Sequence, residues 1–391
     1  MHHYSRRLLW NFHANSLSDQ ARERRTSGQA INDLTRSNPT ECFEDYPHEE
    51  IGRAFAELKS FRYNPEPLGA ESARYAVCTY YKSRGIHMTP DRLILTASTS
   101  EAYALLFKLL CDPGDEILVP TPSYPLFEFL ADLESVRSKS YQMEFDGAWY
   151  LDFNRLHNQI TDRTRALVVV NPNNPTGSFL KQNEFEVLLN VAGKQRMPII
   201  SDEVFLDYGF GADSDRVTTF IESDAVLSFS LNGLSKAAGM PQMKLGWIAI
   251  NGPVEERARA RERLELIADT YLSVGTPVQY ALPRLFEIGE KIRRSIAGRT
   301  RTNLSKLYQI LQDSAAQVLR CEGGWSAIVR LPATQSEESW TLRLLNECGV
   351  LVQPGYFFDM ASEPYIVVSL ITAPEEFEQG IAQIHNLAMS H

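Results

Sequence analysis

Short apolar runs alternate with helix-like stretches through the middle of the chain. The runs are rich in Val, Ile and Leu, and they occupy residues 92–98, 115–123, 165–172, 197–205 and 225–233. The first run is followed at 100–110 by apolar residues with a helical period. Continuous apolar strands separated by helices are typical of a parallel sheet that is buried on both faces. We therefore predict an α/β fold whose large domain has three layers, αβα, around a mostly parallel sheet.

The pattern changes after residue 252. Residues 253–272 carry interspersed charges and predict a long, solvated helix that leads out of the large domain. Further strand-like pieces at 325–332, 350–356 and 365–371 precede an amphipathic helix at 375–388. These elements predict a smaller α+β domain, which the N-terminal segment completes. The predicted division is 46–280 for the large domain, and 1–45 together with 281–391 for the small one.

Composition and charge disfavour several classes of function. The chain of 391 residues has a net charge of −10 and a pI near 5.4, which disfavours a nucleic-acid or anionic-membrane partner. It has no apolar run near the roughly 20 residues that a membrane span needs, and no secretory signal. Its five cysteines are scattered without CxxC spacing, which predicts reduced thiols of a cytoplasmic protein and no metal site.

The stretch SLNGLSKAAGMPQMKLGW at 230–247 offers the first candidate for chemistry. Lys236 lies just after an apolar run and is flanked by small residues, with a second cation, Lys244, eight positions later. Desolvation and a neighbouring cation keep a lysine amine partly neutral, and such an amine can form a Schiff base with an aldehyde. Taken by itself, this pattern favours an ordinary surface lysine.

Two further motifs change that balance. NPNNPTG at 171–177 directly follows a strand, and its two Asn-Pro pairs predict a rigid turn at the sheet edge where open α/β sheets bind ligands. Asn174 would present its amide to a ligand there. Asp202 ends the apolar run PIISD, where a buried carboxylate needs a partner such as a pyridinium nitrogen. The alternative for Asp202 is the N-cap of a helix.

With TASTSEA, PTPSYP and KLGW in the same order, these motifs resemble the class I and II aminotransferases, which are fold-type I pyridoxal-phosphate enzymes. The resemblance runs from about residue 30 to the end, and it implies their fold and pyridoxal 5'-phosphate as the cofactor. It implies that Lys236 forms the Schiff base and moves a proton, that Asp202 keeps the ring nitrogen protonated, and that Asn174 donates to the phenolic oxygen. The other implied cofactor contacts are ring stacking by Tyr124 and phosphate binding by Ser98, Thr99, Ser100 and Lys244. The first three of these phosphate-binding residues could instead be a simple helix cap.

The resemblance also concerns the assembly. Tyr63, in the run FRYNPEP, is similar to a tyrosine that reaches the phosphate in the neighbouring subunit's site. This implies a homodimer with shared active sites. An aromatic residue that only packs within a Pro-rich loop is the alternative.

Three positions depart from the family pattern. Phe205 stands where a tyrosine commonly contacts the phenolic oxygen, and Lys244 stands where an arginine is usual. Val367, in YIVVSLI, stands where an arginine ordinarily grips the substrate carboxylate in a two-pronged salt bridge. Arg330 is the substitute that we consider first for substrate binding, although an ordinary exposed strand residue is the simpler interpretation.

These features predict an aminotransferase that transfers an amino group from an amino donor to a keto acid. The same scaffold and cofactor would also suit a carbon–sulfur β-lyase or another eliminase. Val367 leaves room for a degenerate pseudoenzyme that binds the cofactor without turnover. A cofactor-sensing regulator fused to a DNA-binding head is disfavoured by the acidic charge. The donor and the acceptor stay open.

Overall fold

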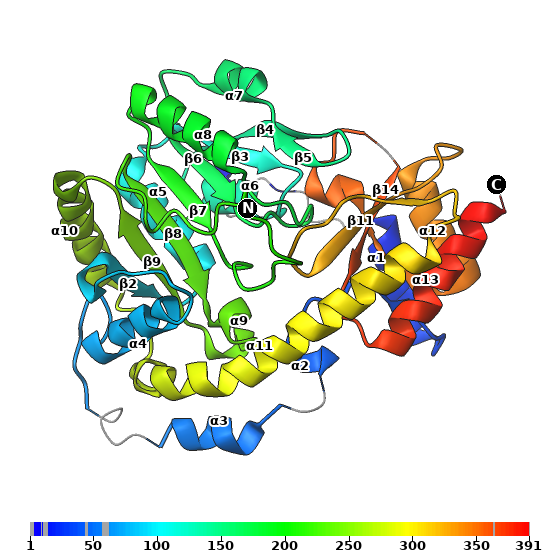
Figure 1. Ribbon diagram of the computed structural model, residues 1–391, viewed down its shortest axis with the longest axis horizontal. Helices are drawn as coiled ribbons and strands as arrows, with labels where there is room; N and C mark the ends of the chain where they lie inside the picture. Colours follow the sequence, from blue (N-terminus) through cyan, green and yellow to red (C-terminus); the bar gives the residue numbers. More distant parts are fainter. Residues whose placement is uncertain are drawn as a thin grey trace.

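The larger sheet confirms the fold class that the apolar runs predict. The structure is a computed structural model, and it describes residues 4–8, 10, 15–43, 46–56, 62–362 and 364–390. Within these residues the sheet has eight strands in the order β2-β9-β8-β7-β6-β3-β4-β5 (Figure 1). Neighbours from β8 to β4 in this order pair in parallel, whereas β9 is antiparallel to both β2 and β8, and β5 is antiparallel to β4. The strand bounds are β2 Leu93–Thr96, β3 Glu116–Thr121, β4 Arg137–Phe145, β5 Trp149–Leu151, β6 Thr164–Val170, β7 Ile199–Asp202, β8 Ser228–Gly233 and β9 Gly246–Asn251.

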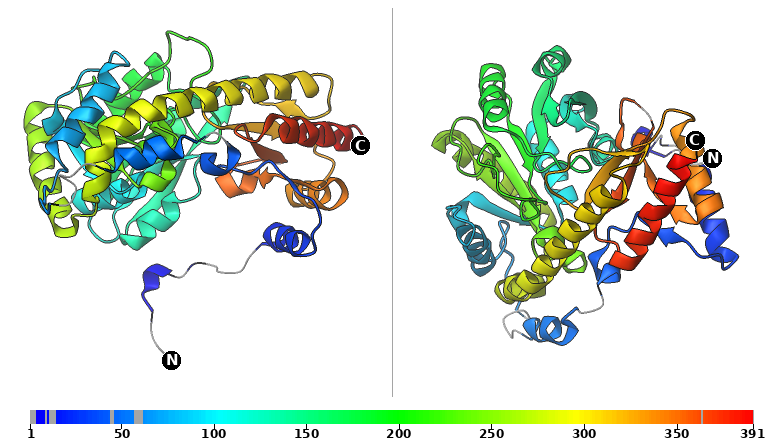
Figure 2. Two further views of the ribbon diagram at one scale, coloured as in Figure 1. Left: turned by 90° about the horizontal axis from the view of Figure 1, so that it is seen from below. Right: turned by 45° about the vertical axis from the view of Figure 1, so that its right-hand side comes forward.

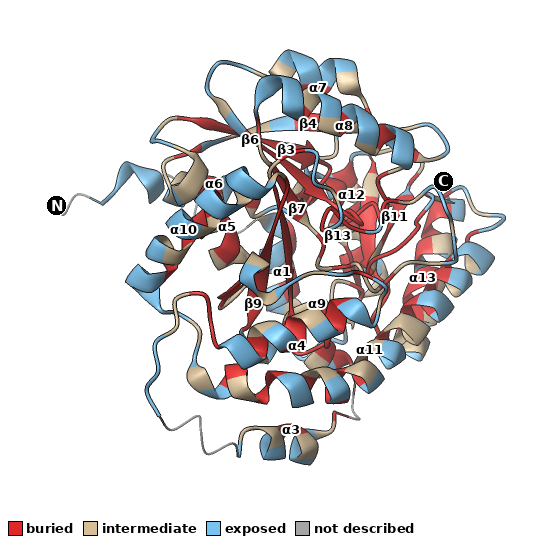
Figure 3. Ribbon diagram, turned by 60° about the vertical axis from the view of Figure 1, so that its left-hand side comes forward, coloured by how far each residue is buried: buried red, intermediate tan, exposed pale blue. Residues whose placement is uncertain are grey.

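Helices cover both faces of this sheet. Along β9, Ile248 and Ile250 pack in one core cluster, while Trp247 and Ala249 pack in another on the opposite face. The first face is covered by α5, α6 and α10, and the second by α4, α7, α8 and α11, so the strands lie buried between two helical layers (Figure 3). The helix bounds are α4 Glu71–Lys82, α5 Thr99–Leu110, α6 Phe127–Leu133, α7 Phe153–Gln159, α8 Gln182–Gln195, α10 Val254–Tyr271 and α11 Thr276–Ile310.

The charged helix predicted at 253–272 exists, but the prediction that it leads out of the large domain is wrong. Ala260, Leu264 and Ala268 of α10 are buried in the same core cluster as α5 and the sheet. This narrow stripe, spaced by four residues, is enough to dock a helix whose other positions are solvated. The helix that crosses to the second sheet is the 35-residue α11, drawn in yellow in Figure 1.

The second sheet has four antiparallel strands, in the order β10-β11-β14-β13 within the described residues. Val329, Ile366 and Val368 are buried on one face against α11, α12 and α13. The N-terminal segment joins this region, because β1 pairs in parallel with β12 and α1 packs on α12 (Figure 2). The exact domain boundaries stay a prediction. The bounds are α1 Ser16–Thr26, β1 Asn32–Asp33, β10 Gln317–Val318, β11 Ser326–Arg330, α12 Glu337–Cys348, β12 Val350–Leu351, β13 Gln353–Pro354, β14 Tyr365–Ser369 and α13 Pro374–Met389.

Shorter elements complete the described chain. They are η1 Arg6–Leu8, α2 Pro39–Cys42, α3 His48–Ala54, η3 Pro90–Arg92, α9 Leu234–Ala237, η4 Pro241–Met243 and η5 Gly355–Phe358. Among the helices of the described residues, none combines the length and the hydropathy that crossing a membrane requires.

Gly289 lets α11 lie against the turn that follows Lys236. A Cβ at Gly289 would lie 2.4 Å from the Cβ of Ala238 and 2.9 Å from its Cα. We predict that Gly289→Ala lowers the free energy of unfolding by about 1–3 kcal/mol, because the packed backbone cannot make room. Gly298→Ala on the same helix is the control, since its added Cβ meets nothing within 4 Å. There we expect a gain of up to about 1 kcal/mol from helix propensity. Urea denaturation measures both variants, and equal effects would contradict the packing argument.

Candidate active site

Four adjacent strands of the large sheet end at one edge, and each brings a predicted residue there. In the sheet order β8-β7-β6-β3, Lys236 follows β8, Asp202 ends β7, Asn174 follows β6 and Tyr124 follows β3. These strands pair in parallel, so their carboxyl ends lie side by side. Parallel pairing therefore gathers residues that lie up to 112 positions apart in the chain, from 124 to 236.

Lys236 lies on the short helix α9, inside a group of aromatic side chains. Its Nζ lies 4.6 Å from the ring centre of Trp325 and 5.7 Å from that of Phe205. Its main-chain carbonyl accepts a hydrogen bond of 2.7 Å from the hydroxyl of Tyr208. Burial lowers the pKa of the Lys236 amine to about 8, and the negative charge of Asp202 opposes that shift. The amine is therefore nearer to neutrality than an exposed lysine.

Asp202 is half-buried and is held by two donors. The hydroxyl of Tyr103 donates to its Oδ2 at 3.1 Å, and the backbone N–H of Val204 donates to its Oδ1 at 3.2 Å. Burial raises the pKa of the Asp202 carboxyl to about 6, while these hydrogen bonds and the charge of Lys236 act in the opposite direction. The carboxylate keeps its charge near neutral pH and can pair with a cationic ring nitrogen.

The N-terminus of α5 lies at the same edge, directly after β2. Ser98 is the N-cap, and its Oγ accepts the N–H of Glu101 at 3.1 Å. Its predicted alternative role as a helix cap is therefore confirmed. A Cβ at Gly246 would come within 3.2 Å of the Ser98 carbonyl carbon, so the KLGW segment, including Lys244, runs close to this helix start.

Several polar side chains at this edge have no hydrogen-bond or ion-pair partner within the described residues. Neither a hydrogen bond nor an ion pair is formed by the side chains of Thr99, Ser100, Asn174, Lys236 or Lys244, all of them half-buried or exposed. Two cations, two hydroxyls and an amide are thus left for a ligand beside a helix N-terminus, which suits a phosphate ester that also carries an aldehyde. The residues present fit pyridoxal phosphate.

Tyr124 and Tyr63 are both exposed. The ring of Tyr124, 47% exposed, lies close enough to Asp202 that the carboxylate charge adds to burial in raising its pKa. Tyr63 is 81% exposed in the loop before α4, where it lines a cavity of about 60 Å³ with Tyr271. Tyr124 therefore belongs to the edge that carries Asp202, whereas Tyr63 points its ring into solvent.

Arg330 is not brought beside Lys236. It is the last residue of β11, its side chain is exposed, and it bonds to Gln317 on the neighbouring strand. Trp325, which contacts Lys236, precedes the same strand, and five residues of strand span about 16 Å. An arginine side chain does not reach back over that distance, so nothing in the geometry supports Arg330 as a substrate ligand.

Val367 lies in apolar surroundings. It is 1% exposed and pairs with Ile328 across β11 and β14. It packs in a cluster with Trp149, Leu319 and Phe358, on the sheet face opposite to the one that α12 and α13 cover. The position that resembles a carboxylate-binding arginine is therefore filled by a close-packed aliphatic side chain.

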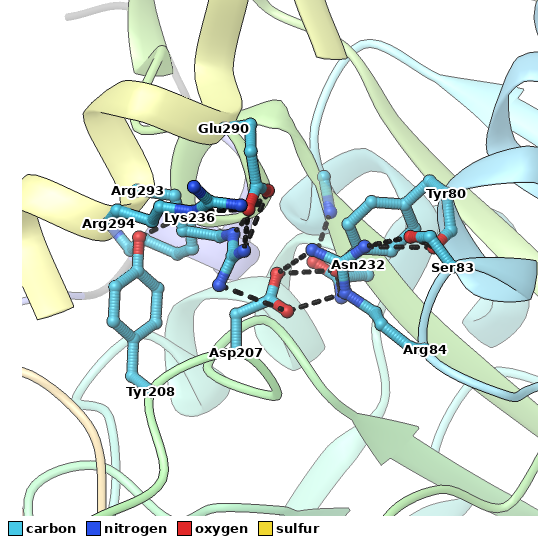
Figure 4. A network of polar contacts seen from close by, with 11 residues as sticks. Tyr80, Ser83, Arg84, Asp207, Tyr208, Asn232, Lys236, Glu290, Arg293 and Arg294 are labelled. Carbon is cyan, nitrogen blue, oxygen red and sulfur yellow. Dashed lines mark hydrogen bonds and ion pairs between the residues drawn. The ribbon is translucent and has the colours of Figure 1, made fainter. Parts of the chain in front are cut away.

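Sequence reasoning missed a polar network behind Lys236. The Asp207 carboxylate, 7% exposed, accepts from Tyr80 at 2.8 Å and from Arg84 at 2.6 and 3.0 Å, and Arg293 lies 3.8 Å away (Figure 4). Tyr80 lies on α4, Arg84 lies two residues after the end of that helix, and Arg293 lies on α11, so the network fixes the loop between β7 and β8 to both helices. Tyr208, the next residue, reaches Lys236 from this loop. No sequence motif marks Asp207 or Tyr208, because their partners are distant in the chain.

Comparisons with known proteins show which family the sequence and the fold resemble. The sequence model of the family described as aminotransferase class I and II matches residues 30–384. The glutamate-pyruvate aminotransferase of Haemophilus influenzae is 25% identical over 91% of this chain and 90% of that protein. The tyrosine aminotransferase of Mus musculus is 27% identical over 95% of this chain and 86% of that protein. Among solved structures, the alanine aminotransferase from Pyrococcus furiosus matches with a TM-score of 0.87 at 25% identity, covering 100% of both chains.

Asp207 provides a test of the network. We predict that Asp207→Asn lowers the free energy of unfolding by about 3–5 kcal/mol, because two guanidinium groups lose their buried counter-charge. Glu49→Gln is the control, since it breaks an ion pair with Arg53 whose side chains are 85% and 76% exposed. That change should cost less than about 1 kcal/mol. Denaturant titration of both variants measures the difference, and a small loss for Asp207→Asn would show that the network is not a structural anchor.

Proposed function

This chain belongs to the aminotransferase class I and II family, and from that premise we propose that it transfers an amino group from an amino donor to a keto acid through pyridoxal phosphate held by Lys236. Aminotransferase activity follows from the family, whereas the cofactor contacts of individual residues are our proposal. The observation that carries it is the convergence of Lys236, Asp202, Asn174 and Tyr124 at the ends of four adjacent strands.

The bound cofactor would supply an aldehyde for the amino group and a ring that accepts electrons. The Lys236 amine would hold the cofactor and, once free, move a proton at the substrate carbon, a task suited to its lowered pKa. Asp202 would keep the ring nitrogen protonated, and Asn174 would donate its amide N–H to the phenolic oxygen. Tyr124 would cover the ring face. In this proposal each of these side chains makes a different contact with the cofactor.

The phosphate would be held at the start of α5. Thr99 and Ser100 would donate their hydroxyls, Ser98 would remain the helix cap while its neighbouring N–H groups face the anion, and Lys244 would add a positive charge. Lys244 cannot form the bidentate contact of an arginine, so we expect a phosphate that is held more by hydroxyl and N–H groups than by a salt bridge.

Phe205 leaves the phenolic oxygen with one donor fewer than a tyrosine would give. Tyr208 lies in the same loop, but its hydroxyl donates a hydrogen bond to the Lys236 carbonyl. We therefore propose that Asn174 is the principal donor to that oxygen, and that Phe205 contributes an apolar wall beside the Lys236 amine.

The assembly and location are also proposals. The exposed Tyr63 would reach the site of a second copy, which would make the active unit a homodimer with shared sites. All five cysteines are free thiols, which favours a reducing compartment such as the cytoplasm. The relatives named above act on glutamate and pyruvate, on tyrosine or on alanine, so their names leave the substrate of this chain open.

Lys236→Ala tests the cofactor assignment. We predict that borohydride reduction of the loaded wild-type protein fixes the cofactor to the tryptic peptide that contains Lys236, and that Lys236→Ala loses both this mass and the visible absorbance. Lys194→Ala is the control, because it removes an exposed lysine of α8 that has no proposed role at the site. Attachment to any other lysine of the wild type would overturn the assignment.

A half-reaction screen tests the reaction type. We predict that the loaded protein, mixed with a suitable amino donor and no keto acid, converts its cofactor to the pyridoxamine form once per site. The donors to compare are amino acids, decarboxylated amines and amino sugars. Release of pyruvate and ammonia without an acceptor would indicate a lyase instead, and cofactor binding without any conversion would indicate a pseudoenzyme. A response only to donors without a carboxylate would match the apolar surroundings of Val367.

A further inference from the structure

Trp325 is the side chain whose ring lies closest to the amine of Lys236. The Lys236 Nζ lies 4.6 Å from its ring centre, within the range of a cation–π contact. The indole also packs edge-on against two other rings, and its ring centre lies 5.5 Å from that of Phe205 and 5.1 Å from that of Tyr208. Trp325 itself is 3% exposed. The amine is therefore bordered by an aromatic enclosure, which we define as Phe205, Tyr208 and Trp325.

The backbone at Trp325 is held from two directions. On one side the Trp325 carbonyl accepts the N–H of Leu370 at 2.7 Å, which ties it to the end of the strand β14 of the second sheet. On the other side the N–H of Gly324 donates to the carbonyl of Tyr208 at 3.0 Å. Gly323 forms a bridge with Gly209, and a Cβ at Gly323 would come within 2.9 Å of the Tyr208 carbonyl oxygen. The backbone that carries the indole is thus fixed between the second sheet and the loop after β7, and the ring itself packs against Phe205 and Tyr208.

An aromatic ring suits an amine that must change its charge. A carboxylate at the same distance would hold the ammonium strongly and keep it protonated. A ring face attracts the ammonium only weakly and also packs against the neutral amine. Among the described residues, Asp202 is the charged group that acts on the pKa of Lys236. Arg84 and Arg293 pair with Asp207, and the Tyr208 hydroxyl donates to the Lys236 carbonyl.

We propose that Trp325 is a positioning residue for Lys236: it holds the amine by its ring face when the amine is free of the cofactor, and thereby places it for proton transfer. Because Trp325 leads into β11, the position of the amine depends on how the second sheet rests against the large one. This inference rests on the proposed function, in which Lys236 carries the cofactor and moves the proton.

Three substitutions of Trp325 test the proposal in the loaded protein. Trp325→Leu and Trp325→Met remove the ring, and Trp325→Phe keeps a smaller one. The control is Trp340→Phe, which changes a buried tryptophan in the core between α12 and the second sheet, away from Lys236. Either of the ring-free variants suffices if the other does not fold, as judged by circular dichroism.

The first readout is exchange of the substrate α-proton for deuterium, measured by mass spectrometry with a donor identified in the half-reaction screen. We expect the ring-free variants to exchange at least about tenfold more slowly with little change in KM, since the loss falls on placement of the amine rather than on binding. Trp325→Phe should recover part of the rate, and Trp340→Phe should match the wild type.

The second readout is the pH dependence of acetylation of the Lys236 amine in the pyridoxamine form of the protein, in which this amine is free. The ring favours the charged form of the amine, so its removal should lower the pKa of Lys236 by about half a unit. Wild-type rates and pKa in both ring-free variants would overturn the role of Trp325. Borohydride attachment of the wild type somewhere other than Lys236 would instead overturn the proposed function, so the two failures are distinguishable.

Discussion

The burial of the Lys236 amine and the Asp202 carboxyl at one edge of the sheet is the constraint on which the rest of the site depends. Burial acts on the two groups in opposite directions, lowering the pKa of Lys236 to about 8 and raising that of Asp202 to about 6, while their mutual attraction opposes both shifts. Both groups therefore stay charged near neutral pH, yet each is closer to a change of charge than an exposed side chain. Their separation is set by the parallel pairing of β7 with β8, which places the two strand ends next to each other.

Lys236 and Asp202 must be held in fixed positions, and one loop makes most of the contacts that hold them. The segment from Asp202 to Gly209 carries the carboxylate, the wall residue Phe205, the anchor Asp207 and the donor Tyr208. Asp207 fixes the loop to α4 and α11, and Gly209 fixes it to the second sheet. A misplaced Lys236 would lose the aromatic contact and the carbonyl bond together, so the network supports the chemistry without touching a substrate.

Two of the three expected departures from the family pattern, Phe205 and Val367, share a physical direction. Phe205 would leave the phenolic oxygen without a hydroxyl beside it, and Val367 puts an aliphatic side chain on a face where Trp149 and Phe358 pack. The large ring of Trp325 also lies next to the amine. The site therefore keeps the groups that would bind the cofactor and replaces polar groups around them with apolar ones. From such surroundings we expect substrates to be selected by shape and desolvation more than by charge.

The sequence by itself determined the type of each layer, the identity of the edge that carries chemistry, and the residues proposed to hold the cofactor, because strands of continuous apolar residues and ordered motifs are local signals. The sequence prediction placed α10 wrongly, because the apolar stripe of Ala260, Leu264 and Ala268 that packs on the core lies among many charged residues. The sequence also did not show that Arg330 ends the strand β11, whereas Trp325 directly precedes its first residue. The roles of Trp325, Asp207 and Tyr208 were decided only by the tertiary structure. Each acts through partners from other elements, between 28 and 123 residues away in the cases of the Tyr208–Lys236 and Arg84–Asp207 bonds. Contacts over such separations depend on how sheets and helices pack, and no local pattern of residues encodes them.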